Sequence, residues 1–185
     1  MEEFMNSLEI NILKAKEAAI EFRKKFSSKE EFGVDLNDVS EKYSESINKR
    51  ISIMELDLHE GSKISGFTLI NGNNIYICVN SNDSTIRQRF TVAHELGHLF
   101  LGDIDVNKDT DSTNIFYRLD LDMARKNPEL FAKEQRANIF ASELLMPGEQ
   151  VEKLYEQGIS IFEMSGMFGV SKQAMEIAVR RILGL

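Results

Sequence analysis

His94-Glu95-Leu96-Gly97-His98, near the middle of this 185-residue chain, places two histidines four positions apart with a glutamate after the first. Positions four apart on an α-helix differ by about 40° in rotation, so both imidazoles project from one helical face and can bind one metal ion. Glu95 lies beside such an ion, where its carboxylate can accept a proton from an attacking water. This is the zincin spacing, which predicts a helix carrying two metal ligands and a general base.

The residues around this pattern indicate a helix packed against other parts of the protein. One apolar stripe at helical spacing predicts a half-buried helix over about 84–101, and it consists of Ile86, Phe90, Ala93, Gly97 and Leu101. A glycine in a helix interior costs about 1 kcal/mol relative to alanine. We therefore expect another segment to approach the helix backbone at Gly97.

Upstream of this helix the sequence predicts two helices and a small sheet. Apolar residues recur at helical spacing over 5–26 and 35–47, and strand patterns cover 50–56, 64–70 and 75–79. The turn sequence Asn71-Gly72-Asn73-Asn74 joins the last two strands into a hairpin. We expect a small antiparallel sheet beside the helix at 84–101.

Downstream of this helix the pattern is mainly helical. Residues 103–127 are polar and acidic, with a short strand expected at 114–119. Asn127-Pro128 begins a helix that Met146-Pro147-Gly148 ends, and three shorter helices are expected at 149–157, 160–168 and 171–183. The order of elements is typical of an α+β fold with a zincin-like core.

We expect three parts in the chain. An N-terminal helix occupies residues 1–34, and the zincin-like domain occupies 35–157. The remaining segment, 158–185, resembles a helix-turn-helix and is expected to pack on that domain.

Composition limits the class of protein. The chain has 22 basic and 30 acidic residues, a formal net charge of -8, which argues against a general polyanion binder. No apolar run approaches the roughly 20 residues of a membrane span, and the initial Met-Glu-Glu-Phe lacks the positive charge of a secretory signal. The single Cys78 excludes an intrachain disulfide. We expect a cytoplasmic protein without membrane contact.

A catalytic zinc ion normally takes three protein ligands, so a third must come from outside the motif. One zincin subclass has a histidine six residues after the second motif histidine, but Ile104 stands there. The remaining histidine, His59, lies in a segment expected to be an exposed loop. We therefore expect a carboxylate to complete the site.

Glu134 is the first candidate for this carboxylate. On the helix expected at 128–146 it shares one face with Ala137, Asn138, Ala141 and Leu145. Asn138, one turn later, can orient a ligand or fill a packing gap. Glu143 lies about 180° around the helix from Glu134 and is expected to face water. Asp103 follows the motif helix so closely that only a tight turn brings it back.

Two separated blocks of sequence carry a family resemblance. Arg89 to His98 reads Arg-Phe-Thr-Val-Ala-His-Glu-Leu-Gly-His, and Glu134 to Pro147 reads Glu-Gln-Arg-Ala-Asn-Ile-Phe-Ala-Ser-Glu-Leu-Leu-Met-Pro. In this order the blocks resemble the ImmA/IrrE family of zinc metallopeptidases, and the resemblance extends over roughly residues 35–183. It implies a gluzincin-like core in which His94, His98 and Glu134 bind Zn²⁺ and Glu95 is the base.

The resemblance also implies a substrate. Family members act on helix-turn-helix repressors, so we expect a protease that cleaves such a repressor to control mobile-element or stress genes. Arg136 stands where members commonly have an acidic residue, a departure that we expect to leave the metal site untouched. The loop at 103–127 is long, which puts substrate recognition in question. Tyr117, Arg118 and Tyr155 are candidate donors to the oxyanion that peptide hydrolysis generates.

Two other functions remain open. Residues 161–181 match a helix-turn-helix, with Gly169 at the turn and Ser171 as N-cap, so a DNA-binding regulator is one alternative. Residues 158–185 contain three basic and two acidic side chains, which argues against direct DNA binding and favours packing or partner docking. The other alternative is a zinc sensor that regulates a repressor without proteolysis and uses the same ligands.

Overall fold

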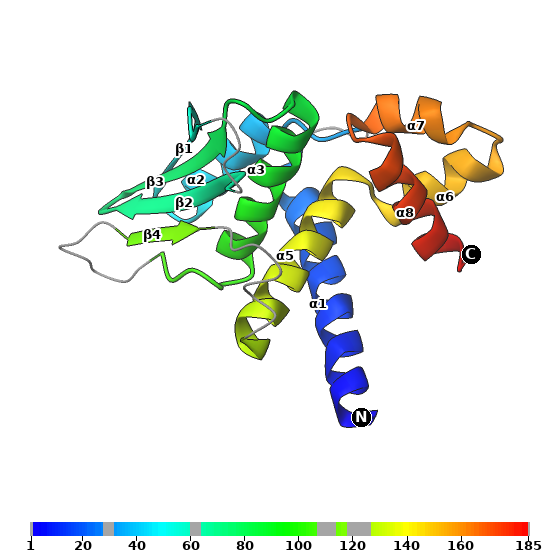
Figure 1. Ribbon diagram of the computed structural model, residues 1–185, viewed down its shortest axis with the longest axis horizontal. Helices are drawn as coiled ribbons and strands as arrows, with labels where there is room; N and C mark the ends of the chain where they lie inside the picture. The colour runs from blue at the N-terminus through cyan, green and yellow to red at the C-terminus, as the bar shows by residue number, and fades with distance from the viewer. Residues whose placement is uncertain (1, 28–31, 60–63, 107–113, 118–126, 185) are drawn as a thin grey trace.

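The sheet packs against one side of the helix that carries His94 to His98, and other helices pack against the opposite side of that helix (Figure 1). The computed structural model describes residues 2–27, 32–59, 64–106, 114–117 and 127–184. Its elements, in chain order, are α1 (Glu2–Phe26), α2 (Leu36–Ser46), β1 (Arg50–Leu56), β2 (Gly66–Asn71), β3 (Asn74–Asn80), α3 (Thr85–Phe100), β4 (Asn114–Tyr117), α5 (Pro128–Leu145), α6 (Gly148–Glu156), α7 (Ile161–Phe168) and α8 (Lys172–Leu183). The predicted α+β class is confirmed.

The described strands form one sheet in the order β1-β3-β2-β4. β2 and β3 make the predicted hairpin, and β4 adds to β2 in antiparallel orientation. β1 runs parallel to β3, so the sheet is mixed rather than antiparallel throughout as expected. β3 pairs with β1 on one side and with β2 on the other. Because β1 and β2 run in opposite directions, only one of these two pairings is antiparallel. A strand's own apolar pattern does not specify which neighbour it takes.

The C-terminal half of α3 is buried more completely than the sequence predicted, whereas Ile86 of the predicted stripe is 43% exposed. Its apolar stripe indicated a half-buried helix, but every residue from 91 to 99 is buried. The sheet covers one face of this part of α3 and α5 covers another (Figure 1). The expected close approach at Gly97 is confirmed, since a Cβ there would lie 3.0 Å from the ring of Phe140 on α5.

A cluster of aromatic rings ties the helices together behind α3. The ring centroid of Phe22 on α1 lies 5.1 Å from that of Phe100 and 5.5 Å from that of Phe140. Tyr43 from α2 joins the same cluster, 5.3 Å from Phe22. Such pairs each contribute about 0.5–1.5 kcal/mol beyond their buried area, so α1, α2, α3 and α5 are held in one core.

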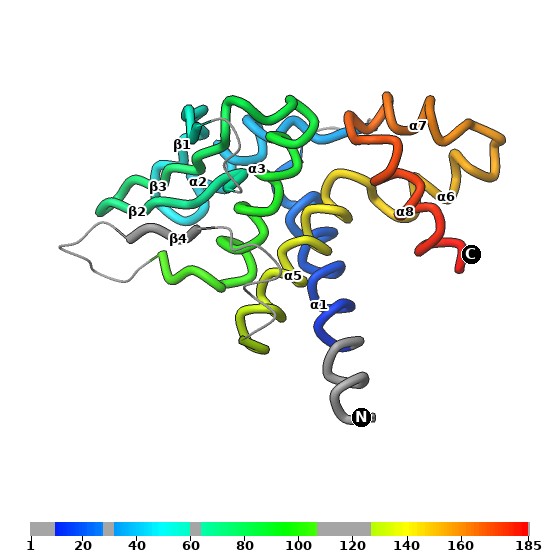
Figure 2. The backbone as a smooth tube through the Cα atoms, in the orientation of Figure 1, coloured from blue at the N-terminus to red at the C-terminus, as the bar shows by residue number. Residues whose placement is uncertain are grey.

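The last three helices gather beyond the C-terminal end of α5 (Figure 2). α7 begins with a capping box formed by Ser160 and Glu163. Gly169 takes a left-handed conformation, with φ 62°, at the predicted turn, and Ser171 caps α8. None of the described helices combines the length and the apolar character that a membrane crossing requires.

Candidate metal centre

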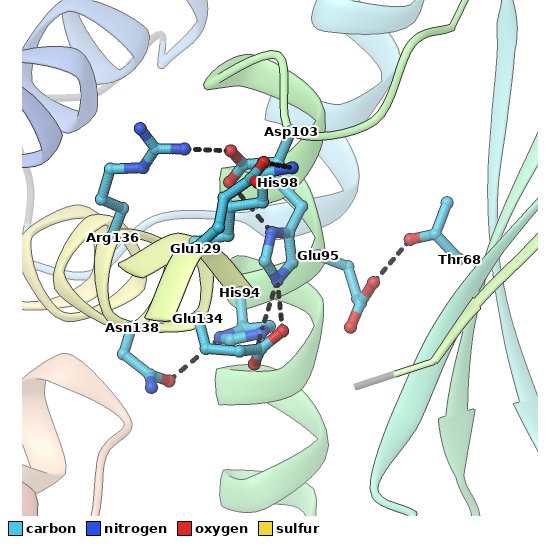
Figure 3. A network of polar contacts seen from close by, with 10 residues as sticks. Thr68, His94, Glu95, His98, Asp103, Glu129, Glu134, Arg136 and Asn138 are labelled. Atoms are coloured by element: carbon cyan, nitrogen blue, oxygen red, sulfur yellow. Dashed lines mark hydrogen bonds and ion pairs between the residues drawn. The ribbon is translucent and has the colours of Figure 1, made fainter. Parts of the chain in front are cut away.

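The structure brings His94, His98 and Glu134 together between α3 and α5 (Figure 3). The two Nε2 atoms lie 3.0 Å apart. The Glu134 carboxylate faces both rings, with Oε2 3.3 Å from Nε2 of His94 and Oε1 3.3 Å from Nε2 of His98. All three side chains are buried. Two imidazole nitrogens and a carboxylate thus converge on one point.

The outer nitrogen of each imidazole contacts an oxygen. Nδ1 of His94 lies 3.0 Å from Oδ1 of Asn138, and Nδ1 of His98 lies 3.1 Å from Oδ2 of Asp103. Because both partners are acceptors, each Nδ1 carries a proton and donates it. The Nε2 atoms then face inward toward Glu134, where each can share a proton with that carboxylate or, without that proton, coordinate a metal ion. Asn138 was expected either to orient a ligand or to fill a packing gap, and its contact with His94 supports the first role.

Asp103 reaches His98 through the turn that ends α3. Gly102 has φ 71°, a left-handed conformation that glycine adopts easily. The N–H of Asp103 donates to the carbonyl of His98 at 3.0 Å, and the N–H of Gly102 donates to that of Leu99 at 3.3 Å. These two bonds make a Schellman turn. The tight turn that the sequence left open therefore exists, and it brings Asp103 to the outer nitrogen of His98.

Electrostatics suits this donor set. Burial alone lowers the pKa of His98, but hydrogen bonds to Asp103 and Glu134 outweigh it and raise that pKa to about 9. Burial raises the pKa of Glu134, but hydrogen bonds from the two histidines outweigh this effect and lower it to about 2. Glu134 is therefore an ionised acceptor. Two imidazoles and one carboxylate fit a divalent ion such as Zn²⁺, whose binding displaces the proton on His98.

Glu95 lies beside the three converging groups. Its carboxylate is 1% exposed and points toward β2, where Oε2 accepts a hydrogen bond of 2.6 Å from Oγ1 of the buried Thr68 (Figure 3). Gly66 makes this contact possible, since a Cβ there would lie 2.4 Å from Thr91 on α3. Strand and helix thus approach closely enough to fix the orientation of Glu95.

The profile of one peptidase family, described as the IrrE N-terminal-like domain, matches residues 48–180 of the chain. The chain belongs to this family. The matched part runs from just before β1 into α8, and the resemblance drawn from the two sequence blocks is confirmed. Membership supports a metallopeptidase role and a protein substrate. A comparison with curated proteins found no match.

Other candidates lie elsewhere in this IrrE-like domain. His59 is exposed in the segment that follows β1, as expected. Tyr117 lies on β4, where its backbone pairs with Phe67, and Arg118 is outside the described residues. Tyr155 is 40% exposed on α6, which follows the C-terminal end of α5, and Glu134 lies nearer the other end of α5. The last position disfavours Tyr155 as an oxyanion donor.

The burial of Glu143 differs from the prediction made from the sequence. It is 7% exposed rather than facing water. Its Oε1 accepts a 2.8 Å hydrogen bond from the N–H of Gly148, at the start of α6. This face of α5 is not open to water, because Gly148 at the start of α6 lies against the carboxylate and Ile182 of α8 lies close to Gly148. A carboxylate at a helix N-terminus is stabilised by the free N–H groups there.

Sequence reasoning missed Thr68 and the pairing of Asp103 with Arg136. Thr68 had a signal, because it is the one polar side chain at the inward positions of β2, where Gly66, Thr68 and Ile70 are buried. Gly102 before Asp103 indicated a left-handed turn. Arg136 had no comparable signal, since its partner lies on another element 33 residues away.

Proposed function

We propose that this chain is a zinc-dependent endopeptidase in which His94, His98 and Glu134 bind the metal and Glu95 is the general base. The observation that supports it best is the buried convergence of two Nε2 atoms on the Glu134 carboxylate. Both outer nitrogens are occupied by oxygen acceptors, which leaves the inner ones for a metal. A buried set of this kind costs stability, and buried titratable groups with specific charge partners cluster at functional sites.

His94, His98 and Glu134 would hold the Zn²⁺ ion, which when bound would supply a Lewis acid to polarise a peptide carbonyl and acidify water. Glu95 accepts a proton from the attacking water and returns it to the leaving amine. The Thr68 hydroxyl limits rotation of the Glu95 carboxylate by binding one of its oxygens. Tyr117 on β4 and Arg118, the next residue in the sequence, remain the candidate oxyanion donors.

The proposed substrate is a protein segment in extended conformation. β4 pairs on one side with β2 and is an edge strand among the described residues, so a peptide can add to it as a further strand. The resemblance to ImmA/IrrE proteins favours a helix-turn-helix repressor as the substrate. Cleavage of such a repressor would control mobile-element or stress genes.

The test uses the purified chain and the repressor encoded nearest its gene. Metal content is measured first, and cleavage is then followed by mass spectrometry with wild type and Glu95→Gln. This substitution keeps the size of the side chain and removes the base, so it should retain zinc and lose about 10²–10⁴-fold in rate. Equal cleavage by both proteins would sink the proposal. Zinc binding without cleavage by wild type would favour the sensor.

A further inference from the structure

We propose that Arg136 is a positioning residue for the metal site, acting through Asp103 on the imidazole of His98. Arg136 lies on α5, two residues after Glu134, and its guanidinium contacts Oδ1 of Asp103 (Figure 3). The other oxygen of the same carboxylate accepts from Nδ1 of His98 at 3.1 Å. The inference rests on the metal centre proposed above and assigns it a residue outside the ligand set.

When His98 is neutral, as a metal ligand must be, the Asp103 carboxylate depends on Arg136 for its charge balance. Its side chain is 3% exposed, and both oxygens are engaged. A buried carboxylate needs a cation or strong donors to compensate for its lost hydration. Without the Arg136 guanidinium, Asp103 would gain by turning toward water. His98 would then lose the acceptor that holds its ring, so the ring's orientation depends on a residue that it does not touch.

Arg136 also completes a symmetrical attachment of both histidines to α5. His94 is tied to α5 directly, through Asn138. The partner of His98 is instead in the turn after α3, and Arg136 connects that turn to α5. The Glu134 carboxylate must reach both Nε2 atoms from the same helix. The Asp103–Arg136 pair therefore helps to keep α5 close enough to α3 for Glu134 to reach both histidines.

An interhelical ion pair can also stabilise a fold without tuning a metal site, so the experiment must separate the two effects. The full-length chain is stripped of metal, and the zinc dissociation constant is measured by competition with a chromophoric chelator. The variants are Arg136→Met, which keeps the aliphatic stem, and Arg136→Lys, which keeps the charge. Lys133→Met is the matched control: it removes one positive charge from the same helix, where Lys133 pairs with the exposed Glu129.

We expect Arg136→Met to weaken zinc binding by about 10–100-fold, the effect typical of outer contacts of metal ligands, and Lys133→Met to stay within about twofold of wild type. Arg136→Lys should recover most of the affinity. The visible spectrum of the Co²⁺-loaded protein should change in Arg136→Met, because it reports ligand geometry, which a loss of stability alone does not alter. Equal zinc affinity and equal Co²⁺ spectra in Arg136→Met and Lys133→Met would overturn the inference.

Asp103→Asn provides a second route if Arg136→Met does not fold. It keeps an acceptor oxygen for His98 and removes the charge that Arg136 balances, so zinc affinity should again fall; unchanged affinity overturns the inference. Failure of wild type to bind zinc overturns the metal centre and this inference together. Zinc binding with no cleavage of any repressor overturns the peptidase alone, and the dissociation constants still decide the role of Arg136.

Discussion

The metal centre and the helical pair α7–α8 both correspond to sequence motifs, but they use their polar residues differently. In the metal centre the polar side chains are buried: His94, Glu95 and Glu134 are each at most 3% exposed, and the Glu134 carboxylate contacts His94. In α7–α8 the motif's polar side chains are exposed caps, Ser160 with Glu163 and Ser171, around a core of Met164, Phe168 and Met175. Caps stabilise the helix they begin, whereas buried polar clusters cost stability. We therefore expect the first region to carry the chemistry and the second to serve architecture or docking.

The largest expected effect comes from removing the carboxylate ligand. Glu134→Gln keeps the shape of the side chain but loses the charge that faces both imidazoles. Zinc affinity should fall by more than the roughly 100-fold upper effect of an outer contact. Chelator competition measures it. The matched control is Glu143→Gln, a second buried glutamate of α5 that caps α6, which should lower the unfolding midpoint and leave zinc affinity unchanged. Equal affinity in wild type and Glu134→Gln would remove Glu134 from the site.

Thr68→Val tests the contact that orients the base. The methyl group replaces a hydroxyl that donates to Glu95 at 2.6 Å, so peptide cleavage should slow by about tenfold while zinc affinity stays the same. Thr91→Val is the control, because Thr91 is equally buried but its hydroxyl donates to the carbonyl of Arg87 within α3. The two variants are compared by kcat on one substrate. Equal losses in both would mean that Thr68 contributes packing alone.

The sequence was sufficient where one element carries the information. Helical period places His94 and His98 on one face, and the same period on α5 turned Glu134 inward, where the structure brings it to the histidines. It was insufficient where two elements must be placed relative to each other. Thr68 meets Glu95 where Gly66 lets β2 approach α3, and Glu143 is buried where Gly148, the first residue of α6, meets its carboxylate. Likewise, β1 joins the sheet parallel to β3, a choice its own residues do not encode.

Two glycine-to-alanine substitutions, one on α3 beside the metal centre and one on α7, should change the free energy of unfolding in opposite directions. Gly97→Ala places a methyl group 3.0 Å from the ring of Phe140, which is fully buried in the aromatic cluster and cannot yield. We expect a loss of about 1–3 kcal/mol in the free energy of unfolding. Gly166→Ala on α7 meets nothing within 4 Å, so its better helix propensity should stabilise by up to about 1 kcal/mol. Urea denaturation measures both, and a stable Gly97→Ala variant would mean that α3 and α5 can separate.

The smallest expected effect comes from a change in α7–α8 that should alter stability without altering the metal centre. Ser171→Ala removes the side chain that caps α8, which should lower the free energy of unfolding by about 1 kcal/mol. Zinc affinity should not change, because α8 contributes no residue to the metal centre among the described contacts. The outcome is informative, since Arg89 of α3 lies within 3.4 Å of where a Cβ on Gly169 would stand, next to this cap. A fall in zinc affinity together with stability would show that the C-terminal turn is coupled through Arg89 to the helix that carries both histidines, and that the segment regulates the site rather than only packing on it.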